Sequence, residues 1–246
     1  MRKGAEITGG CLHILSAAGR GTRITVEIKR KTMTIQVLLA DDHAVVRDGL
    51  RFLLEVQGDI SVVGNAVNGR EAVRMVKELK PDVVLMDIAM PELNGIEATH
   101  QIHETCPEAR VVILSMYASV EHVRQALRAG AQGYLLKKSA GAEVVDAVRL
   151  VHAGGGYLSP EITGIVIGDY GADSRGTNPL ELLTHRERQI LQLIAEGKSS
   201  AQAATSLFLS PKTVDTYRSR LMQKLGIHDL HGLIKFAIDH GLTTMD

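Results

Sequence analysis

The chain has 246 residues, 45% of them hydrophobic, which is enough for two domains that each bury a core. Its apolar runs are too short to cross a bilayer, its first residues lack a signal peptide, and its two cysteines form no metal-binding or disulfide pattern. We therefore expect a cytoplasmic protein without a membrane span. The net charge of zero conceals regional differences, which are +5 over residues 1–32, −4 over 33–153, −2 over 154–179 and +1 over 180–246. An acidic middle region argues against nucleic acid as its direct partner.

Short apolar runs alternate with amphipathic stretches between residues 34 and 152. The stretch from Val45 to Leu54 and the stretch from Ala72 to Leu79 both have helical spacing of their apolar residues. Continuous apolar runs separated by helices favour a parallel sheet that is covered on both faces. We therefore predict an α/β domain with a five-stranded, doubly wound parallel sheet of the flavodoxin-like type, with strands at 35–40, 60–66, 83–86, 110–114 and 132–136.

Polar side chains follow four of these predicted strands. The first run ends in Asp41-Asp42, the third in Asp87, the fourth in Ser115 and the fifth in Lys137. Ligands of doubly wound sheets gather at the carboxyl ends of the strands. An isolated aspartate there would more often be a cap or turn residue, but three acids opposite a lysine indicate a site. Clustered carboxylates repel one another unless a cation lies among them, and Mg²⁺ prefers oxygen ligands.

Four motifs carry a resemblance to a known family over residues 35–152: "LLADDH", "VVLMDIAMPELNG", "VVILSMY" and "GYLLKK". Their order and spacing resemble the receiver domain of bacterial two-component response regulators. The resemblance implies that Asp87 accepts a phosphoryl group from a partner sensor histidine kinase. It implies a Mg²⁺ site formed by Asp41, Asp42, Asp87 and the backbone carbonyl of Ala89. It also implies roles in phosphate binding and switching for Ser115, Tyr134 and Lys137.

The receiver is predicted over residues 33–153, followed by a linker over 154–179. The linker is rich in Gly, Asp and Ser, and we expect it to be largely flexible, with a short helix over 161–167. Residues 180–246 have a helical pattern. Thr184 and Glu187 form a capping-box pair, and Ser210-Pro211 is a typical start of another helix.

A helix-turn-helix is predicted within residues 180–246, from two short helices followed by a third, basic helix. The third helix has four basic residues and one acidic residue, which gives it a charge of +3. Helix-turn-helix proteins place this element in the major groove of DNA. A solvated basic face is the alternative. The predicted contacts with double-stranded DNA are Lys212, Thr213, Asp215, Thr216, Tyr217, Arg218, Arg220 and Lys224.

The segment "LTHRERQILQLIAEGKSSAQAATSLFLSPKTVDTYRSRLMQKLGI" is similar to the LuxR-type DNA-binding domain. Together with the receiver it resembles the NarL/FixJ class of response regulators, which implies control of transcription and a homodimer on DNA. Two residues depart from the family pattern. Ala203 replaces a larger aliphatic residue, and Tyr217 stands where histidine is frequent. The apolar stripe Leu233, Phe236 and Ala237 fits either core packing or a dimer contact.

Residues 1–32 do not fit a receiver. Ile24, Val26 and Ile28 alternate with polar residues after a glycine-containing turn, which predicts a hairpin. This segment resembles the terminal hairpin of a histidine-kinase ATPase domain. One hypothesis is that Met33 is the natural start or that the segment derives from an upstream kinase reading frame. The alternative is a genuine basic extension.

The sequence admits three classes of function: an enzyme, a constitutive DNA-binding protein and a phosphorylation-controlled transcription factor. An aspartate-nucleophile phosphohydrolase typically has a second acid two residues after the nucleophile, and Ala89 occupies that position, so we expect no enzyme of this kind. A constitutive DNA-binding protein would not need the complete set of acids, serine and lysine. The sequence therefore favours a transcription factor that is controlled by phosphorylation of Asp87.

Overall fold

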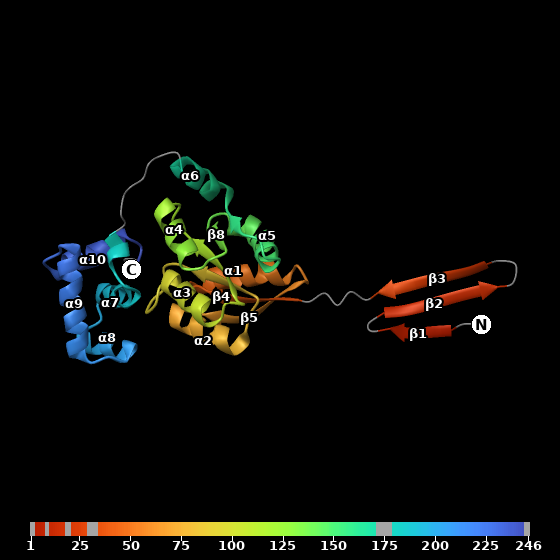
Figure 1. The fold of residues 1–246 in the computed structure, drawn as a ribbon, viewed down its shortest axis with the longest axis horizontal. Helices are drawn as coiled ribbons and strands as arrows, with labels where there is room; N and C mark the ends of the chain where they lie inside the picture. Colours follow the sequence, from red (N-terminus) through yellow and green to blue (C-terminus); the bar gives the residue numbers. More distant parts are fainter. Residues whose placement is uncertain (1–2, 8–9, 18–20, 29–33, 171–178, 244–246) are drawn as a thin grey trace. The chain divides into compact units, whose positions relative to one another are not determined.

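The computed structural model describes residues 3–7, 10–17, 21–28, 34–170 and 179–243. The chain divides into two units, Met1–Thr34 and Ile35–Asp246. The first unit is an antiparallel sheet of β1 (Lys3–Ile7), β2 (Gly10–Ala17) and β3 (Gly21–Ile28) in that order (Figure 1). The predicted hairpin corresponds to β2 and β3, and β1 adds a third strand to it. Met33, which is the natural start under one of the hypotheses above, lies outside the described residues.

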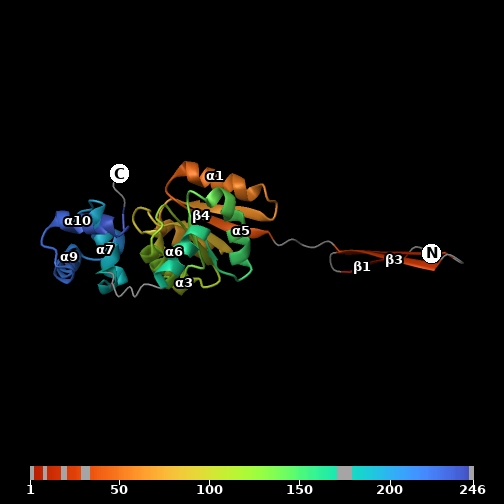
Figure 2. The same cartoon turned by 90° about the horizontal axis from the view of Figure 1, so that it is seen from above.

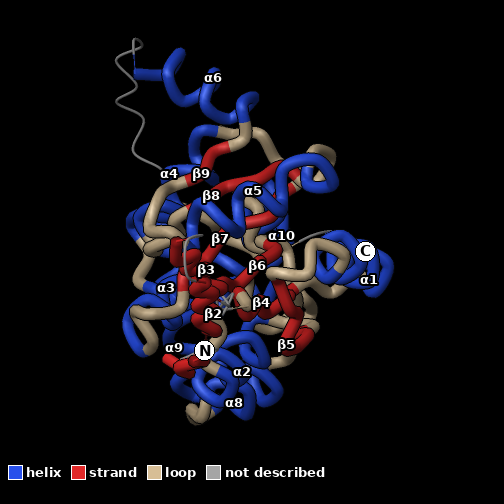
Figure 3. Tube along the Cα trace, turned by 90° about the vertical axis from the view of Figure 1, so that its right-hand side faces the viewer, coloured by secondary structure: helices blue, strands red, loops and turns tan. Residues whose placement is uncertain are grey.

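The second unit begins with a parallel sheet of six strands in the order β5-β4-β6-β7-β8-β9. Figure 3 shows these strands following one another across the domain with helices on both sides. The five predicted strands are confirmed within two residues at each end. The strands are β4 (Ile35–Ala40), β5 (Ile60–Ala66), β6 (Val83–Asp87), β7 (Arg110–Ser115), β8 (Gly133–Leu136) and β9 (Tyr157–Leu158).

Helices cover both faces of this sheet, as the continuous apolar strands predict. One face packs against α1 (Ala44–Glu55) and α5 (Ala140–His152), and the other against α2 (Gly69–Leu79), α3 (Gly95–Thr105) and α4 (Val120–Arg128). Figure 2 shows α1 and α3 on opposite sides of β4. Every side chain of β6 is buried, so this strand lies in the centre of the core.

The sixth strand corrects the predicted linker, although the short helix expected over 161–167 is present within α6. β9 pairs in parallel with β8, and α6 (Pro160–Tyr170) follows it with Ile162 buried in the core beside α4. Ser159 and Tyr157 both donate hydrogen bonds to Glu143 of α5, which fixes this segment to the receiver. A strand of two residues has no periodicity to read. Of the expected linker, 171–178 lie outside the described residues.

The amphipathic pattern of α1 is only partly realised. Leu50 and Leu54 are buried against the sheet as predicted. Val45, which the pattern placed with them, is 85% exposed, and Phe52 is exposed on the same helix. The apolar spacing therefore predicted the helix correctly but not which side chains it buries.

The predicted C-terminal helices are confirmed. They are α7 (His185–Ala195), α8 (Ser200–Leu207), α9 (Pro211–Leu225) and α10 (Leu230–Asp239), preceded by a 3-10 turn over Pro179–Leu182. Thr184 and Glu187 form the predicted capping box, and Ser210 accepts a hydrogen bond from the Thr213 amide. Leu233 and Ala237 are buried in the domain's own core, which favours core packing for this part of the stripe. None of the described helices is long and apolar enough to cross a membrane.

Candidate functional site

The polar residues at the strand ends meet at one edge of the sheet. Asp41 follows β4, Asp87 ends β6, Ser115 ends β7 and Lys137 follows β8. The Lys137 ammonium lies 2.8 Å from Asp41 Oδ2 and 2.8 Å from Asp87 Oδ2. The sheet order places β6 between β4 and β7, which brings residues distant in sequence into one pocket. We call this cluster, with Asp42, the acid pocket.

Burial sets the charge state of the acid pocket. Asp87 is only 2% exposed. This burial raises the pKa of its carboxyl to about 6, an effect that Lys137 opposes and that Asp41 and Asp42 reinforce. Burial by itself would lower the pKa of Lys137, but the neighbouring Asp87 and Asp41 carboxylates outweigh it and leave that pKa raised. Lys137 is therefore a cation at neutral pH, and Asp87 becomes a carboxylate only above about pH 6.

The donor set fits a hard divalent cation. Asp41, Asp42, His43 and Asp87 each offer one ligand atom, and these atoms all lie within 4.8 Å of one another. Asp41 Oδ2 and Asp87 Oδ2 are buried, and the polar partner described for each is the Lys137 ammonium, at 2.8 Å. Buried carboxylate oxygens with free lone pairs suit Mg²⁺. Ala89, the fourth predicted ligand, lies two residues beyond Asp87 in a half-buried loop.

His43 is a member of the cluster that the sequence prediction missed. Its Nδ1 lies 2.7 Å from Asp42 Oδ1 and 3.3 Å from Asp41 Oδ1. Its backbone amide also donates to Asp41 Oδ1 at 2.8 Å. The signal was its position directly after the acid pair, but a histidine that follows a turn is common without any such role.

Ser115 and Tyr134 meet at the segment between β7 and α4. Ser115 Oγ accepts a hydrogen bond from the Tyr117 amide at 2.9 Å. Tyr134 is fully buried, and its hydroxyl donates to the Tyr117 carbonyl at 2.9 Å. Burial raises the pKa of Tyr134 to about 12, so the phenol remains a donor. The predicted switch aromatic thus points inward in this structure.

The loop after Asp87 folds back so that Gly95, at its end, lies against the backbone of Asp87 and Ile88. The Gly95 amide donates to the Ile88 carbonyl at 2.9 Å, and a Cβ on Gly95 would lie 1.9 Å from the Asp87 carbonyl oxygen. Gly95 does not have a positive φ. Close backbone approach, rather than a backbone angle that only glycine adopts, therefore requires glycine at this position.

The predicted DNA-contacting residues differ in how they are placed. Thr213 and Arg218 are half-buried. Tyr217 packs against the helical core, and Lys224 Nζ lies 2.7 Å from Glu187 Oε2, so both side chains also support the domain itself. Ala203, the small residue of α8, is completely buried. Lys212, Thr216 and Arg220 are exposed and have no such contact with the domain core. Asp215 is also exposed, but it accepts a hydrogen bond from Ser200.

A sheet-edge acid pocket with an opposed lysine and a capped helix-turn-helix in the same chain define a regulator with a receiver and a DNA-binding output domain. Family models agree with both parts. The response regulator receiver domain matches residues 37–149, and the luxR family of bacterial regulatory proteins matches residues 181–237.

Known proteins support the same assignment. Oxygen regulatory protein NreC of Staphylococcus carnosus is 38% identical over 210 residues, which cover 83% of this chain and 97% of that protein. NreC of Staphylococcus aureus is 37% identical with the same coverage. The chain therefore belongs to the LuxR family of two-component response regulators, which are DNA-binding transcription regulators and not enzymes.

Solved structures show the same fold. A LuxR-family response regulator from Aurantimonas sp. SI85-9A1 matches with a TM-score of 0.55 and 37% identity, covering 56% of this chain and 99% of that chain. The RcsB response regulator of Salmonella typhimurium matches with a TM-score of 0.53 and 25% identity, covering 83% of this chain and 98% of that chain. The second match spans both the receiver and the helical domain.

Proposed function

We propose that this response regulator is switched by phosphorylation of Asp87, with a sensor histidine kinase as phosphoryl donor in the cytoplasm. The observation that carries the proposal is the position of the Lys137 ammonium, 2.8 Å from both Asp41 and Asp87. A cation held against two buried carboxylates is placed to neutralise a phosphoryl group that arrives at either of them.

The chemistry follows from the pocket. An Asp87 carboxylate oxygen attacks the phosphorus of the donor phosphohistidine, and the phosphorus–nitrogen bond breaks with its electron pair leaving on the imidazole. Lys137 pairs with one phosphoryl oxygen as a compact point charge. The Ser115 hydroxyl donates a hydrogen bond to another phosphoryl oxygen. The product is an acyl phosphate on Asp87.

A divalent cation belongs to the same proposal. Asp41, Asp42, Asp87 and the Ala89 carbonyl would hold Mg²⁺, which when bound offsets the negative charge of the phosphoryl oxygens. The fit rests on the buried Asp41 and Asp87 carboxylates, for which the one compensating cation described is Lys137. His43 lies at the exposed rim of the cluster.

The output of the switch is DNA binding through α9. Lys212, Thr216 and Arg220 are exposed and available to reach base edges or phosphates. Lys224 and Tyr217 contribute mainly to the domain's packing in this proposal, because both already have partners within it. Two copies bind DNA together, as helix-turn-helix dimers bind two half-sites.

The test combines phosphorylation with DNA binding. Wild type and Asp87→Asn are incubated with Mg²⁺ and acetyl phosphate, and affinity for DNA selected from a random-sequence pool is measured at fixed salt. Labelling and tighter DNA binding in wild type, both absent in Asp87→Asn, are the expected result. DNA affinity that is equal with and without the donor, in both proteins, would make the chain a constitutive DNA-binding protein and refute the proposal.

A further inference from the structure

Helix α7 of the DNA-binding domain contacts the loop that follows Asp87. Gln192 on this helix is completely buried. Its Nε2 donates to the Met90 carbonyl at 2.9 Å, and its Oε1 accepts from the Asn94 amide at 2.9 Å and from Asn94 Nδ2 at 3.2 Å. One helical turn after Gln192, at the C-cap of α7, Glu196 Oε1 accepts from the Glu92 amide at 3.1 Å. The carboxamide of Gln192 thus joins both ends of the segment from Met90 to Asn94.

This segment belongs to the phosphorylation site. It begins beside Ala89, whose carbonyl is a proposed Mg²⁺ ligand, and Met90 is buried. The Ile88 amide donates to the Leu114 carbonyl at 3.3 Å, and the Ile88 carbonyl accepts from Gly95. The receiver therefore fixes the segment on one side and Gln192 fixes it on the other.

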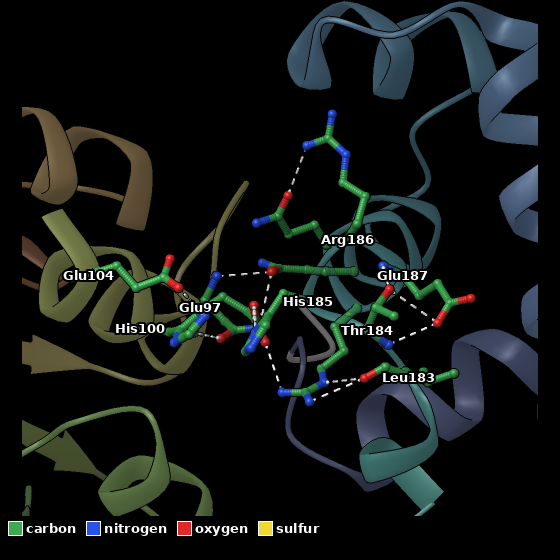
Figure 4. Close-up of polar contacts among 12 residues, drawn as sticks. Glu97, His100, Glu104, Leu183, Thr184, His185, Arg186 and Glu187 are labelled. Carbon is green, nitrogen blue, oxygen red and sulfur yellow. Dashed lines mark hydrogen bonds and ion pairs between the residues drawn. The ribbon is translucent and has the colours of Figure 1, made fainter.

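A second polar contact holds α7 against α3. Glu97 is buried, with its Oε2 2.8 Å from His185 Nδ1 (Figure 4). Its Oε1 lies 3.0 Å from Arg188 Nη1. His185 also stacks on His100 with ring centroids 3.7 Å apart. Because α3 begins directly after the loop, this contact helps to hold α7 in the position from which Gln192 bonds to the loop. Charge-assisted hydrogen bonds to a buried carboxylate make this a specific contact.

The docked position is compatible with an active protein. Lys212, Thr216 and Arg220 on α9 remain exposed while α7 contacts the receiver. This exposure does not fit a contact that would cover the DNA-reading helix.

We infer that Gln192 is a positioning residue for the phosphorylation site, so that docking of α7 favours Mg²⁺ binding and phosphorylation of Asp87. This inference rests on the proposed function. Fixing a loop costs conformational entropy, and a loop that Gln192 already holds does not incur that cost when the ion and the phosphoryl group bind. Coupling is reciprocal, so phosphorylation strengthens the docking of α7 by the same factor.

The experiment compares full-length wild type with Gln192→Ala and Gln192→Met. The methionine variant keeps the side-chain volume and removes only the hydrogen bonds. Gln189→Ala is the matched control, because Gln189 is also buried on α7 but its carboxamide oxygen accepts from Arg186 within the same helix. Far-UV circular dichroism verifies that each variant is folded.

Three quantities are measured. Hydrogen exchange of the backbone amides of residues 88–95 is measured without Mg²⁺ or phosphoryl donor. Mg²⁺ affinity is measured by calorimetry. The phosphorylation rate with acetyl phosphate is measured across a Mg²⁺ titration. In both Gln192 variants we expect exchange to be about five to ten times faster, and Mg²⁺ affinity and phosphorylation rate to fall by a similar factor, which corresponds to one net hydrogen bond. Gln189→Ala should match wild type.

The outcomes separate this inference from the proposed function. Wild-type exchange and Mg²⁺ affinity in both Gln192 variants, or a higher phosphorylation rate, would overturn the inference. If wild type is not phosphorylated at all, while exchange rises and Mg²⁺ affinity falls only in the Gln192 variants, the positioning role stands and the proposed function fails.

Discussion

Replacing Asp87 with asparagine should stabilise the receiver at neutral pH. The folded protein raises the pKa of this carboxyl from about 3.8 to about 6, chiefly through burial. Between these two values the native state binds more protons than the unfolded state, so wild-type stability falls as the pH rises through this window. Asparagine resembles the protonated acid in shape and does not ionise, so the stability of the variant does not fall as the pH rises through this window.

The size of the effect follows from the shift. Two pKa units correspond to about 3 kcal/mol, and relaxation of the pocket makes about 2 to 3 kcal/mol the expected gain at pH 7.5. Loss of the attraction to Lys137 is already included, because Lys137 opposes burial in setting this pKa. Near pH 4 the gain should nearly vanish, since the wild-type carboxyl is then protonated in the folded protein.

The assay is urea unfolding monitored by hydrogen exchange of peptides from β6 and β7, which reports on the receiver alone. Asp146→Asn on the exposed surface of α5 is the matched control and should change stability little at either pH. A variant that is no more stable than wild type at pH 7.5, or a gain of equal size at pH 4, would refute the reasoning.

Further predictions concern backbone approach, DNA contacts and pH. Gly95→Ala should destabilise the receiver by about 2 to 4 kcal/mol, because its Cβ would lie 1.9 Å from a carbonyl oxygen. Gly49→Ala on α1, where nothing lies within 4 Å, should instead stabilise by about 0.5 to 1 kcal/mol in the same urea unfolding. Arg220→Ala should lower the slope of log affinity for DNA against log salt concentration by about one, the value for one lost phosphate contact. Lys224→Ala should chiefly lower the melting temperature of the helical domain, because Lys224 pairs with Glu187. Burial lowers the pKa of His122, so stability should fall as the pH drops below 6.5, and His122→Gln should reduce that dependence in thermal melts at pH 7.5 and 5.5.

The sequence predicted the features that depend on local pattern. Apolar runs located the strands, and the rule that parallel strands end at one edge placed Asp41, Asp87 and Lys137 in one pocket. The helix caps at Thr184 and Ser210 could be predicted from the sequence, because a capping residue and its partner lie three residues apart.

Features that depend on contacts between residues far apart in the sequence could not be predicted. Gln192 bonds to Asn94 across 98 residues, and the Glu97 contacts with His185 and Arg188 span about as far. No periodicity marks such partners, and a glutamine on a helix has many ordinary uses. The exposure of Val45 was missed for a related reason, since helical spacing does not say which turn extends beyond the sheet.

The central claim is that Asp87 is the residue that carries the phosphoryl group, and chemical trapping tests it most directly. The protein is incubated with Mg²⁺ and acetyl phosphate, the acyl phosphate is reduced with borohydride, and the modified residue is located by peptide mass spectrometry. The account predicts homoserine at position 87 and at no other aspartate. Modification of Asp41 or Asp42, or of no aspartate under conditions that phosphorylate a known receiver, would contradict it.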